Sequence, residues 1–262
     1  MPHPTSAPGI DLWLTFYQEL TDPRLLDELR GLLSEAERQQ AARFHFADDR
    51  KRYLATRALV RTVLSRYAPV APTDWVFTAN AYGRPQIDPC HGEAAGLHFN
   101  LSHTQGLIVL GVARHGALGV DVEHLHARQV SPGLGERFFS PAEAAALAAV
   151  PPAQRQARFF EYWTFKEAYI KARGMGLSIP LDRFGFDYPH EHAVQLTIDP
   201  ALGDDAQRWQ FWQFRPTPDH LLAICTERPP TPLPTPTLRR VVPTLADEVW
   251  PAMVMRESWV GY

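Results

Sequence analysis

Two carboxylates two positions apart are the first residues whose type and spacing suggest chemistry. Asp121 and Glu123 lie in Leu118–Glu123, an apolar segment that predicts a β-strand. Side chains two apart on a strand project from one face, so the carboxylates should lie side by side while Val120 and Val122 point to the core. Like charges at that distance repel each other unless a cation lies between them, and a divalent cation with oxygen ligands meets that need. The simpler alternative is a pair of solvated carboxylates on an edge strand.

A second charged pair follows in Trp163–Lys171 (WTFKEAYIK), which has helical spacing. Glu167 and Lys171 are four positions apart, so on a helix they share a face. The apolar residues Phe159 and Trp163 belong to a stripe that would anchor this helix in the core. An isolated pair of this kind is surface decoration worth about 0.2–0.5 kcal/mol. On an anchored helix, however, a carboxylate and an ammonium can complete a metal site and neutralise a phosphate.

The segment Asn100–His103 (NLSH) offers donors for an anionic ligand. Ser102 and His103 can donate hydrogen bonds to a phosphate, and a protonated His103 adds positive charge. A serine nucleophile with a histidine base is a second interpretation. It is disfavoured because adjacent residues on a strand point to opposite faces and no G-x-S-x-G surrounds Ser102. Taken alone, His103 is also compatible with a structural role.

Basic residues in two places are further candidates for phosphate binding. Arg43 and the run Arg50–Arg52 lie near the start of a predicted helix, and Arg84 lies in the turn Tyr82–Pro85 (YGRP). A guanidinium together with turn backbone can grip a phosphate. A solvated helical face is the alternative interpretation of the run around Arg52.

Alternating helices and strands must position these residues. In the first part of the chain, the hydrophobic pattern predicts a strand at 10–19, helices within 25–67 with a Ser34/Glu37 capping box, and a short strand at 75–78. A buried hairpin of 107–113 and 118–123 around the turn 114–116 is expected next. Helices within 141–173 that end at Gly174 follow, and then strands at 184–188, 193–198, 209–214 and 221–226. This order indicates an α+β protein of two similar halves meeting near residue 120.

Three segments are therefore expected along the chain: residues 1–118, residues 119–227 carrying the metal site, and a C-terminal segment 228–262. The last begins with a proline-rich stretch, 228–237, which predicts a semi-rigid linker. The residues beyond it contain Trp250, Trp259 and Tyr262 and are expected to dock on the body of the protein.

Composition narrows the class of protein. The 262 residues carry a formal net charge of −3, which gives no electrostatic case for nucleic acid as a partner. The two cysteines, Cys90 and Cys225, lack metal-ligand spacing and suit a reducing compartment. No apolar run approaches the ~20 residues that span a bilayer, and the first residues do not resemble a signal peptide. We therefore expect a cytoplasmic protein without a membrane partner.

With these motifs in place, the chain resembles the surfactin-synthetase-activating type of 4′-phosphopantetheinyl transferase, in its W/KEA form. The resemblance covers about residues 10–226 and is carried by Phe99–His103 (FNLSH), Leu118–Glu123 (LGVDVE) and Trp163–Lys171, with support from Tyr82–Pro85, Arg137–Ser140 (RFFS) and Gly174–Leu177 (GMGL). It implies two pseudo-symmetric α+β halves packed as one monomer, with the active site in the cleft between them.

The resemblance also implies an activity. Such an enzyme transfers the 4′-phosphopantetheine arm of coenzyme A to a serine of an apo acyl, peptidyl or aryl carrier protein and releases 3′,5′-ADP. The K-E-A form looks like the branch that serves fatty-acid and other broadly used carriers, beside polyketide and nonribosomal peptide pathways. Two alternatives are a non-catalytic carrier-binding protein on the same scaffold and another magnesium-dependent phosphoryl-transfer enzyme. The chain lacks the phosphate-binding loops typical of the latter.

Residue roles follow from the same resemblance. Asp121, Glu123 and Glu167 would bind Mg²⁺, with Mn²⁺ as a substitute. Lys171 would steady the pyrophosphate of coenzyme A, and Glu167, directly or through water, would deprotonate the carrier serine. Glu167, Lys171 and Asp121 are thus the expected catalytic residues.

Coenzyme A itself should be held by a wider set of side chains. The residues expected to contact it are Arg43, Arg52, Arg84, Asn100, Ser102, His103, Lys166 and Lys171, with Ser102 and His103 on the 3′-phosphate. Gln40 occupies a position where relatives often carry Lys or Arg, and Arg43 or Arg52 would compensate.

Overall fold

The computed structural model describes residues 9–114, 116–131 and 133–259. Contacts divide them into two compact units, and each of these takes residues from three stretches of the chain. Unit 1 contains 9–79, 85–114 and 236–250, and unit 2 contains 80–84, 116–131, 133–235 and 251–259. The expected boundaries run consecutively along the chain, whereas these units interleave.

Within the described residues of unit 1, five strands form one sheet in the order β12-β11-β1-β5-β4. Their bounds are β1 Ile10–Thr15, β4 His98–Thr104, β5 Leu107–Ala113, β11 Thr237–Val241 and β12 Asp247–Val249. A small separate sheet pairs β2 (Phe77–Ala79) with β3 (Pro85–Ile87). Strand β5 is buried along its whole length and lies between β1 and β4.

The described part of unit 1 also contains the α-helices α1 (Pro23–Gly31), α2 (Glu35–Ala42) and α3 (Ala47–Leu64). Helix α3 packs its apolar face, including Leu59 and Val63, into the core of this unit. The predicted capping box opens α2, because Glu37 N–H donates to Ser34 Oγ (3.3 Å) and Ser34 N–H donates to a Glu37 carboxylate oxygen (2.9 Å). This prediction is confirmed.

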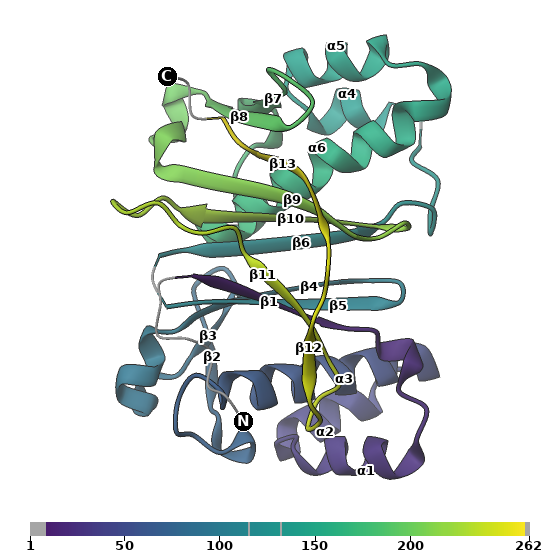
Figure 1. The fold of residues 1–262 in the computed structure, drawn as a ribbon, viewed down its shortest axis with the longest axis vertical. Helices are drawn as coiled ribbons and strands as arrows, with labels where there is room; N and C mark the ends of the chain where they lie inside the picture. Colours follow the sequence, from purple (N-terminus) through teal and green to yellow (C-terminus); the bar gives the residue numbers. More distant parts are fainter. Residues whose placement is uncertain (1–8, 115, 132, 260–262) are drawn as a thin grey trace. The chain divides into compact units, whose positions relative to one another are not determined.

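Unit 2 has a sheet whose described strands run in the order β6-β10-β9-β13-β8-β7. Their bounds are β6 Leu118–His124, β7 Phe184–Asp187, β8 Ala193–Ile198, β9 Trp209–Thr217, β10 His220–Glu227 and β13 Met253–Ser258. Its helices are α4 Leu134–Phe138, α5 Pro141–Ala149 and α6 Pro152–Arg173. Helix α6 packs on β6 and β10 (Figure 1). Helices and sheets in both units confirm the α+β class.

The predicted hairpin of 107–113 and 118–123 is wrong. Both segments are strands, but β5 pairs with β1 and β4, whereas β6 pairs with β10 in the other sheet. An apolar run specifies that a strand is buried, but it does not specify the partner. Residue 115 of the predicted turn lies outside the described residues.

The C-terminal segment is built into both sheets. Residues 228–236 form neither helix nor strand, as the linker prediction requires. Beyond them β11 pairs with β1, and β13 lies between β9 and β8 (Figure 1). Arg256 of β13 is buried and contacts Glu161 of α6 at 3.2 Å. The expected docking of the tail is confirmed, while Tyr262 lies outside the described residues.

A search of the described helices for a segment long and apolar enough to cross a membrane finds none.

Candidate active site

The two carboxylates predicted on a strand lie on β6. Asp121 pairs across the ladder with Ala223 of β10, and Glu123 pairs with Leu221. The intervening Val120 and Val122 are fully buried, as the two-residue periodicity predicts. Asp121 is only 6% exposed, so its carboxylate occupies an environment in which charge needs a partner.

Helix α6 carries the second charged pair. Pro152 begins the helix, where a missing N–H costs nothing, and Gly174 ends it with a φ of 66°, a left-handed conformation suited to glycine. Phe159, Phe165 and Tyr169 belong to the buried core of unit 2, so the helix is anchored. The helical assignment of Trp163–Lys171 and its predicted end are confirmed.

A glycine on β6 lets α6 come close. A Cβ added at Gly119 would lie 1.9 Å from the carbonyl oxygen of Ala168 and 2.4 Å from the backbone nitrogen of Ala172, both on α6. Gly119, Asp121 and Glu123 share one face of the strand, so this contact puts α6 against the face that bears the carboxylates. The sequence interpretation missed Gly119. A glycine inside a strand pattern is the signal that marks close backbone approach.

The close packing joins the two charged motifs. Lys171 Nζ donates to Asp121 Oδ1 at 2.7 Å and to the Val120 carbonyl oxygen at 3.0 Å. The 2.7 Å bond is a charge-assisted hydrogen bond with a largely buried acceptor. The pair Glu167/Lys171 is therefore part of an inter-element cluster and not simple surface decoration.

The charge of Asp121 acts on both neighbouring glutamates, Glu123 and Glu167. Burial, and then the charge of Asp121, raise the pKa of Glu123 to about 7, against the opposing effect of Arg128 and Lys171. Burial and the charge of Asp121 also raise the pKa of Glu167. Arg128 donates to a Glu123 carboxylate oxygen at 2.9 Å. A cation placed among these groups would relieve repulsion that the protein alone leaves in part unbalanced.

The donor types therefore suit a hard divalent cation, which prefers carboxylate oxygens. In the part of the chain that the structure describes, however, no group of three or more His, Cys, Asp or Glu side chains is arranged to hold a metal. The magnesium site thus stays a prediction.

Lys166 points elsewhere. Its ammonium is completely buried and donates to the carbonyl oxygens of Leu181 (2.8 Å) and Phe184 (2.6 Å) and to the carboxylate of Glu143 (2.8 Å). Burial lowers the pKa of Lys166, and Glu143 opposes that effect. The predicted contact of Lys166 with coenzyme A does not fit this placement, because each of its three protons already has an acceptor inside unit 2.

Arg84 also makes contacts inside unit 2. Its guanidinium donates to the carbonyl oxygens of Ala172 (3.1 Å) and Leu118 (2.9 Å), and burial lowers its pKa. These bonds tie the end of α6 to the start of β6. Its contact with coenzyme A stays a prediction.

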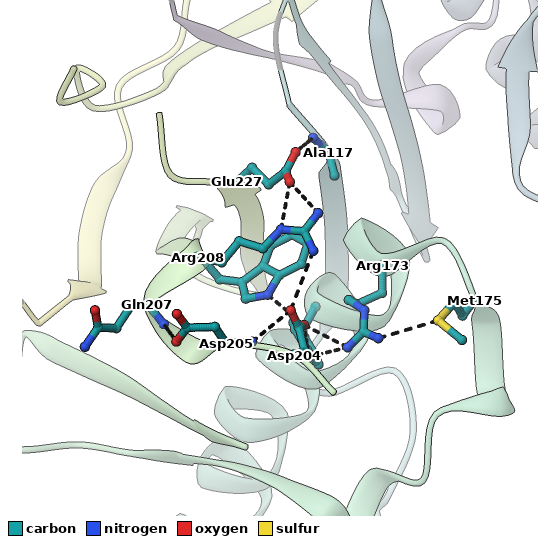
Figure 2. A network of polar contacts seen from close by, with 10 residues as sticks. Ala117, Arg173, Met175, Asp204, Asp205, Gln207, Arg208 and Glu227 are labelled. Carbon is teal, nitrogen blue, oxygen red and sulfur yellow. Dashed lines mark hydrogen bonds and ion pairs between the residues drawn. The ribbon is translucent and has the colours of Figure 1, made fainter. Parts of the chain in front are cut away.

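A polar network fastens the same end of α6 from another side (Figure 2). Asp204, which is nearly buried, pairs with Arg173 of α6 at 2.7 Å. Arg208 donates to Glu227 of β10, and Glu227 accepts from the N–H of Ala117, directly before β6. The network therefore connects α6, β10 and the beginning of β6, the elements that carry or support the charged cluster.

The remaining candidates lie in unit 1. Asn100 and Ser102 of β4 are buried, whereas His103 is exposed, so Ser102 and His103 lie on opposite faces. Arg52 pairs with Asp49 at 2.6 Å, and Arg43 donates to Gln40 at 3.4 Å. Their contacts with coenzyme A stay predictions.

Both halves of the chain are similar in sequence to known proteins. Residues 117–225 match the 4′-phosphopantetheinyl transferase superfamily, and residues 23–115 match its N-terminal model. The 4′-phosphopantetheinyl transferase HetI of Nostoc sp. is 39% identical over 200 residues, covering 76% of this chain and 80% of that protein. Two Bacillus subtilis 4′-phosphopantetheinyl transferases, ffp and Sfp, are 31% and 29% identical over 206 residues, covering 79% of this chain and 87% of each relative.

The matches fall on both halves of the chain, including the cluster of β6 and α6. The chain belongs to the 4′-phosphopantetheinyl transferase superfamily, and it is of the Sfp type.

Proposed function

We propose that this protein is an enzyme that transfers the 4′-phosphopantetheine arm of coenzyme A to a serine of an apo carrier protein and releases 3′,5′-ADP. The observation that carries the proposal is the Lys171–Asp121 pair, with Glu123 and Glu167 in electrostatic reach, in a chain of this superfamily. Mass spectrometry of an apo carrier incubated with coenzyme A and Mg²⁺ tests it. A non-catalytic carrier-binding protein would bind the carrier without changing its mass, and another phosphoryl-transfer enzyme would not add this arm.

The chemistry assigns each residue a task. The serine oxygen attacks the β-phosphate of coenzyme A, the bond to the adenosine diphosphate portion breaks, and 3′,5′-ADP leaves. Lys171 offsets the negative charge of the pyrophosphate as that bond breaks. Glu167 accepts the serine proton, directly or through water.

We propose Mg²⁺ as the metal, with Mn²⁺ as a substitute, because carboxylate oxygens are the ligands that it prefers. Asp121, Glu123 and Glu167 would hold it together with phosphate oxygens and water. When bound, the ion supplies positive charge that offsets the pyrophosphate.

Measurements of unfolding free energy at two pH values test the raised pKa of Glu123. Because the pKa of Glu123 is about 7 in the folded protein and ordinarily 4.5, its ionisation should lower the stability of the folded state as pH rises from about 4.5 to 7. Glu123→Gln should therefore stabilise the protein by at most about 3 kcal/mol above pH 7 and hardly at all below pH 4.5. Urea unfolding at pH 4 and pH 8 measures the difference.

The same unfolding experiment in the presence of Mg²⁺ measures whether the folded protein binds the ion. Mg²⁺ should stabilise the parent protein at pH 8 and stabilise Glu123→Gln less. Glu191→Gln, at an exposed carboxylate of unit 2, is the matched control and should match the parent. A pH-independent effect of Glu123→Gln would contradict the assignment.

Replacing Lys171 tests the cation on α6. Lys171→Ala should lower the single-turnover rate about 10²–10³-fold, the usual effect of removing a group that stabilises charge in the transition state. Lys171→Arg should restore only part of the rate, because a planar guanidinium does not reproduce a compact ammonium. Parental rates in both variants would exclude Lys171 from the chemistry.

For the donor, we propose that Arg43, Arg52, Arg84, Asn100, Ser102 and His103 contact coenzyme A, with His103 on the 3′-phosphate. His103→Ala should then weaken coenzyme A binding about ten- to a hundredfold, the worth of a charge-assisted hydrogen bond. Binding of dephospho-coenzyme A, which lacks that phosphate, should change much less. Calorimetry with both donors makes the comparison, and dephospho-coenzyme A serves as the control ligand. Equal losses with both donors would exclude the 3′-phosphate contact.

The setting of this activity is also part of the proposal. We expect a monomer in the cytoplasm that acts on acyl, peptidyl or aryl carrier domains, without nucleic acid or membrane partners. Gel filtration with light scattering tests the oligomeric state.

A further inference from the structure

We infer that Glu143 is a positioning residue for the transfer reaction. Through a buried ion pair with Lys166 it fixes the rotation of α6 about its own axis, and thereby the side of the helix on which Glu167 and Lys171 are presented to β6. The inference rests on the proposed function.

The carboxylate of Glu143 is held on several sides. Its side chain is 1% exposed and belongs to the first turn of α5. One oxygen accepts from the Ser140 N–H at 2.8 Å and from Lys166 Nζ at 2.8 Å, and the other accepts from the Phe186 N–H of β7 at 2.9 Å. Glu143 therefore joins the beginning of α5, strand β7 and helix α6.

Lys166, the partner of Glu143 on α6, also has several contacts that fix its position. Besides Glu143, the carbonyl oxygens of Leu181 and Phe184 accept its other protons, and its ammonium lies 4.3 Å from the centroid of the Phe184 ring. A buried ammonium with every proton bonded has one low-energy position. The helix is therefore fixed at this residue.

Helix geometry carries this restraint to the charged cluster. At 3.6 residues per turn, Glu167 lies about 100° and Lys171 about 140° around the axis from Lys166. With Lys166 turned toward α5 and β7, the other two face another side of the helix, where Lys171 pairs with Asp121 of β6. Side-chain tips lie about 5–6 Å from the axis, so a rotation of about 10° moves them by about 1 Å. A misplacement of about 1 Å can cost about 10²-fold in rate.

The competing explanation is that the Glu143–Lys166 ion pair only stabilises the fold and does not position α6. Replacing both residues at once separates the positioning role from the stabilising role. Removing one partner of a buried pair leaves an uncompensated charge, whereas replacing both with uncharged groups of similar size is often neutral for stability. Glu143→Gln/Lys166→Met removes both charges with side chains of similar size. The single amide oxygen of the introduced glutamine can accept from the Phe186 N–H, while the Ser140 N–H loses its acceptor. Val194→Ala, which opens a cavity in β8, a strand that carries neither partner of the pair, is the control for lost stability alone.

The experiment measures melting temperature, kcat and the KM for coenzyme A in parent, double variant and control. We expect the double variant to fold and to lose about 30- to 100-fold in kcat with a KM changed less than about threefold, because Glu143 is buried and bonded within unit 2. Val194→Ala should keep its kcat despite a loss in melting temperature at least as large as that of the double variant. A folded double variant with parental kcat, or with a loss no larger than that of the control, would overturn the inference.

Two further measurements test the inference if the double variant does not fold or if the parent protein shows no transfer. Glu143→Asp keeps the charge but shortens the reach by one methylene, so it should fold and lose kcat; an unchanged kcat would overturn the inference even if the double variant does not fold. A parent protein that transfers nothing would refute the proposed function instead. In that case a crystal structure of the double variant still decides, since an α6 in its parental rotation would overturn the inference.

Discussion

Asp121→Asn is expected to lower transfer by about 10³-fold or more while leaving the protein folded. The substitution removes the buried charge that pairs with Lys171 at 2.7 Å and that raises the pKa of both Glu123 and Glu167. Losing about 4 kcal/mol of charge stabilisation in the transition state lowers the transfer rate by about 10³-fold. Folding should survive because the repulsion that Asp121 exerts on the two glutamates disappears with its charge.

The measurement is kcat/KM with a fixed apo carrier, beside circular dichroism and a thermal melt. Asp219→Asn, at an exposed carboxylate in the turn between β9 and β10, is the matched control and should keep parental activity. Near-parental turnover by purified, folded Asp121→Asn would remove this residue from the mechanism.

Gly119→Ala should have the largest effect on stability. The added Cβ would lie 1.9 Å from the Ala168 carbonyl oxygen and 2.4 Å from the Ala172 nitrogen, and both obstacles are backbone atoms that cannot rotate away. Helix α6 would have to withdraw from β6, breaking the packing in the core of unit 2, so we expect a loss of more than about 3 kcal/mol or failure to fold.

Gly31→Ala provides the comparison. Gly31 ends α1, has no atom within 4 Å of an added Cβ and does not have a left-handed backbone, so the substitution should be neutral or slightly stabilising. Urea unfolding of both variants tests the difference. A Gly119→Ala protein as stable as Gly31→Ala would mean that α6 does not depend on this close approach.

The charged cluster was predictable because its information is local. Alternation around Asp121 and Glu123 predicts one strand face, and four-residue spacing predicts that Glu167 and Lys171 share a helix face. Residue types alone could not show that Lys171 pairs with Asp121, because that contact depends on how α6 packs on β6. Gly119 was predictable as well, because a glycine inside a strand marks a close approach of another backbone.

Contacts between residues far apart in the chain could not be predicted from the sequence pattern. The apolar runs at 107–113 and 118–123 predict two buried strands correctly, yet the partner of each lies far away in the chain. Glu143 and Lys166 belong to different helices, and no periodicity links them. In the same way, nothing in the tail predicts that β13 lies between β9 and β8.

Intact-mass spectrometry of the carrier tests the central claim most directly. An apo carrier protein is incubated with coenzyme A, Mg²⁺ and this enzyme, in parallel with Asp121→Asn, with a chelator, and with a carrier whose acceptor serine is replaced by alanine. The account predicts that the parent enzyme adds the mass of one phosphopantetheine to the serine carrier and releases 3′,5′-ADP, and that all three parallel reactions leave the carrier unchanged. An unmodified carrier with the parent enzyme, across acyl, peptidyl and aryl carriers, would contradict it.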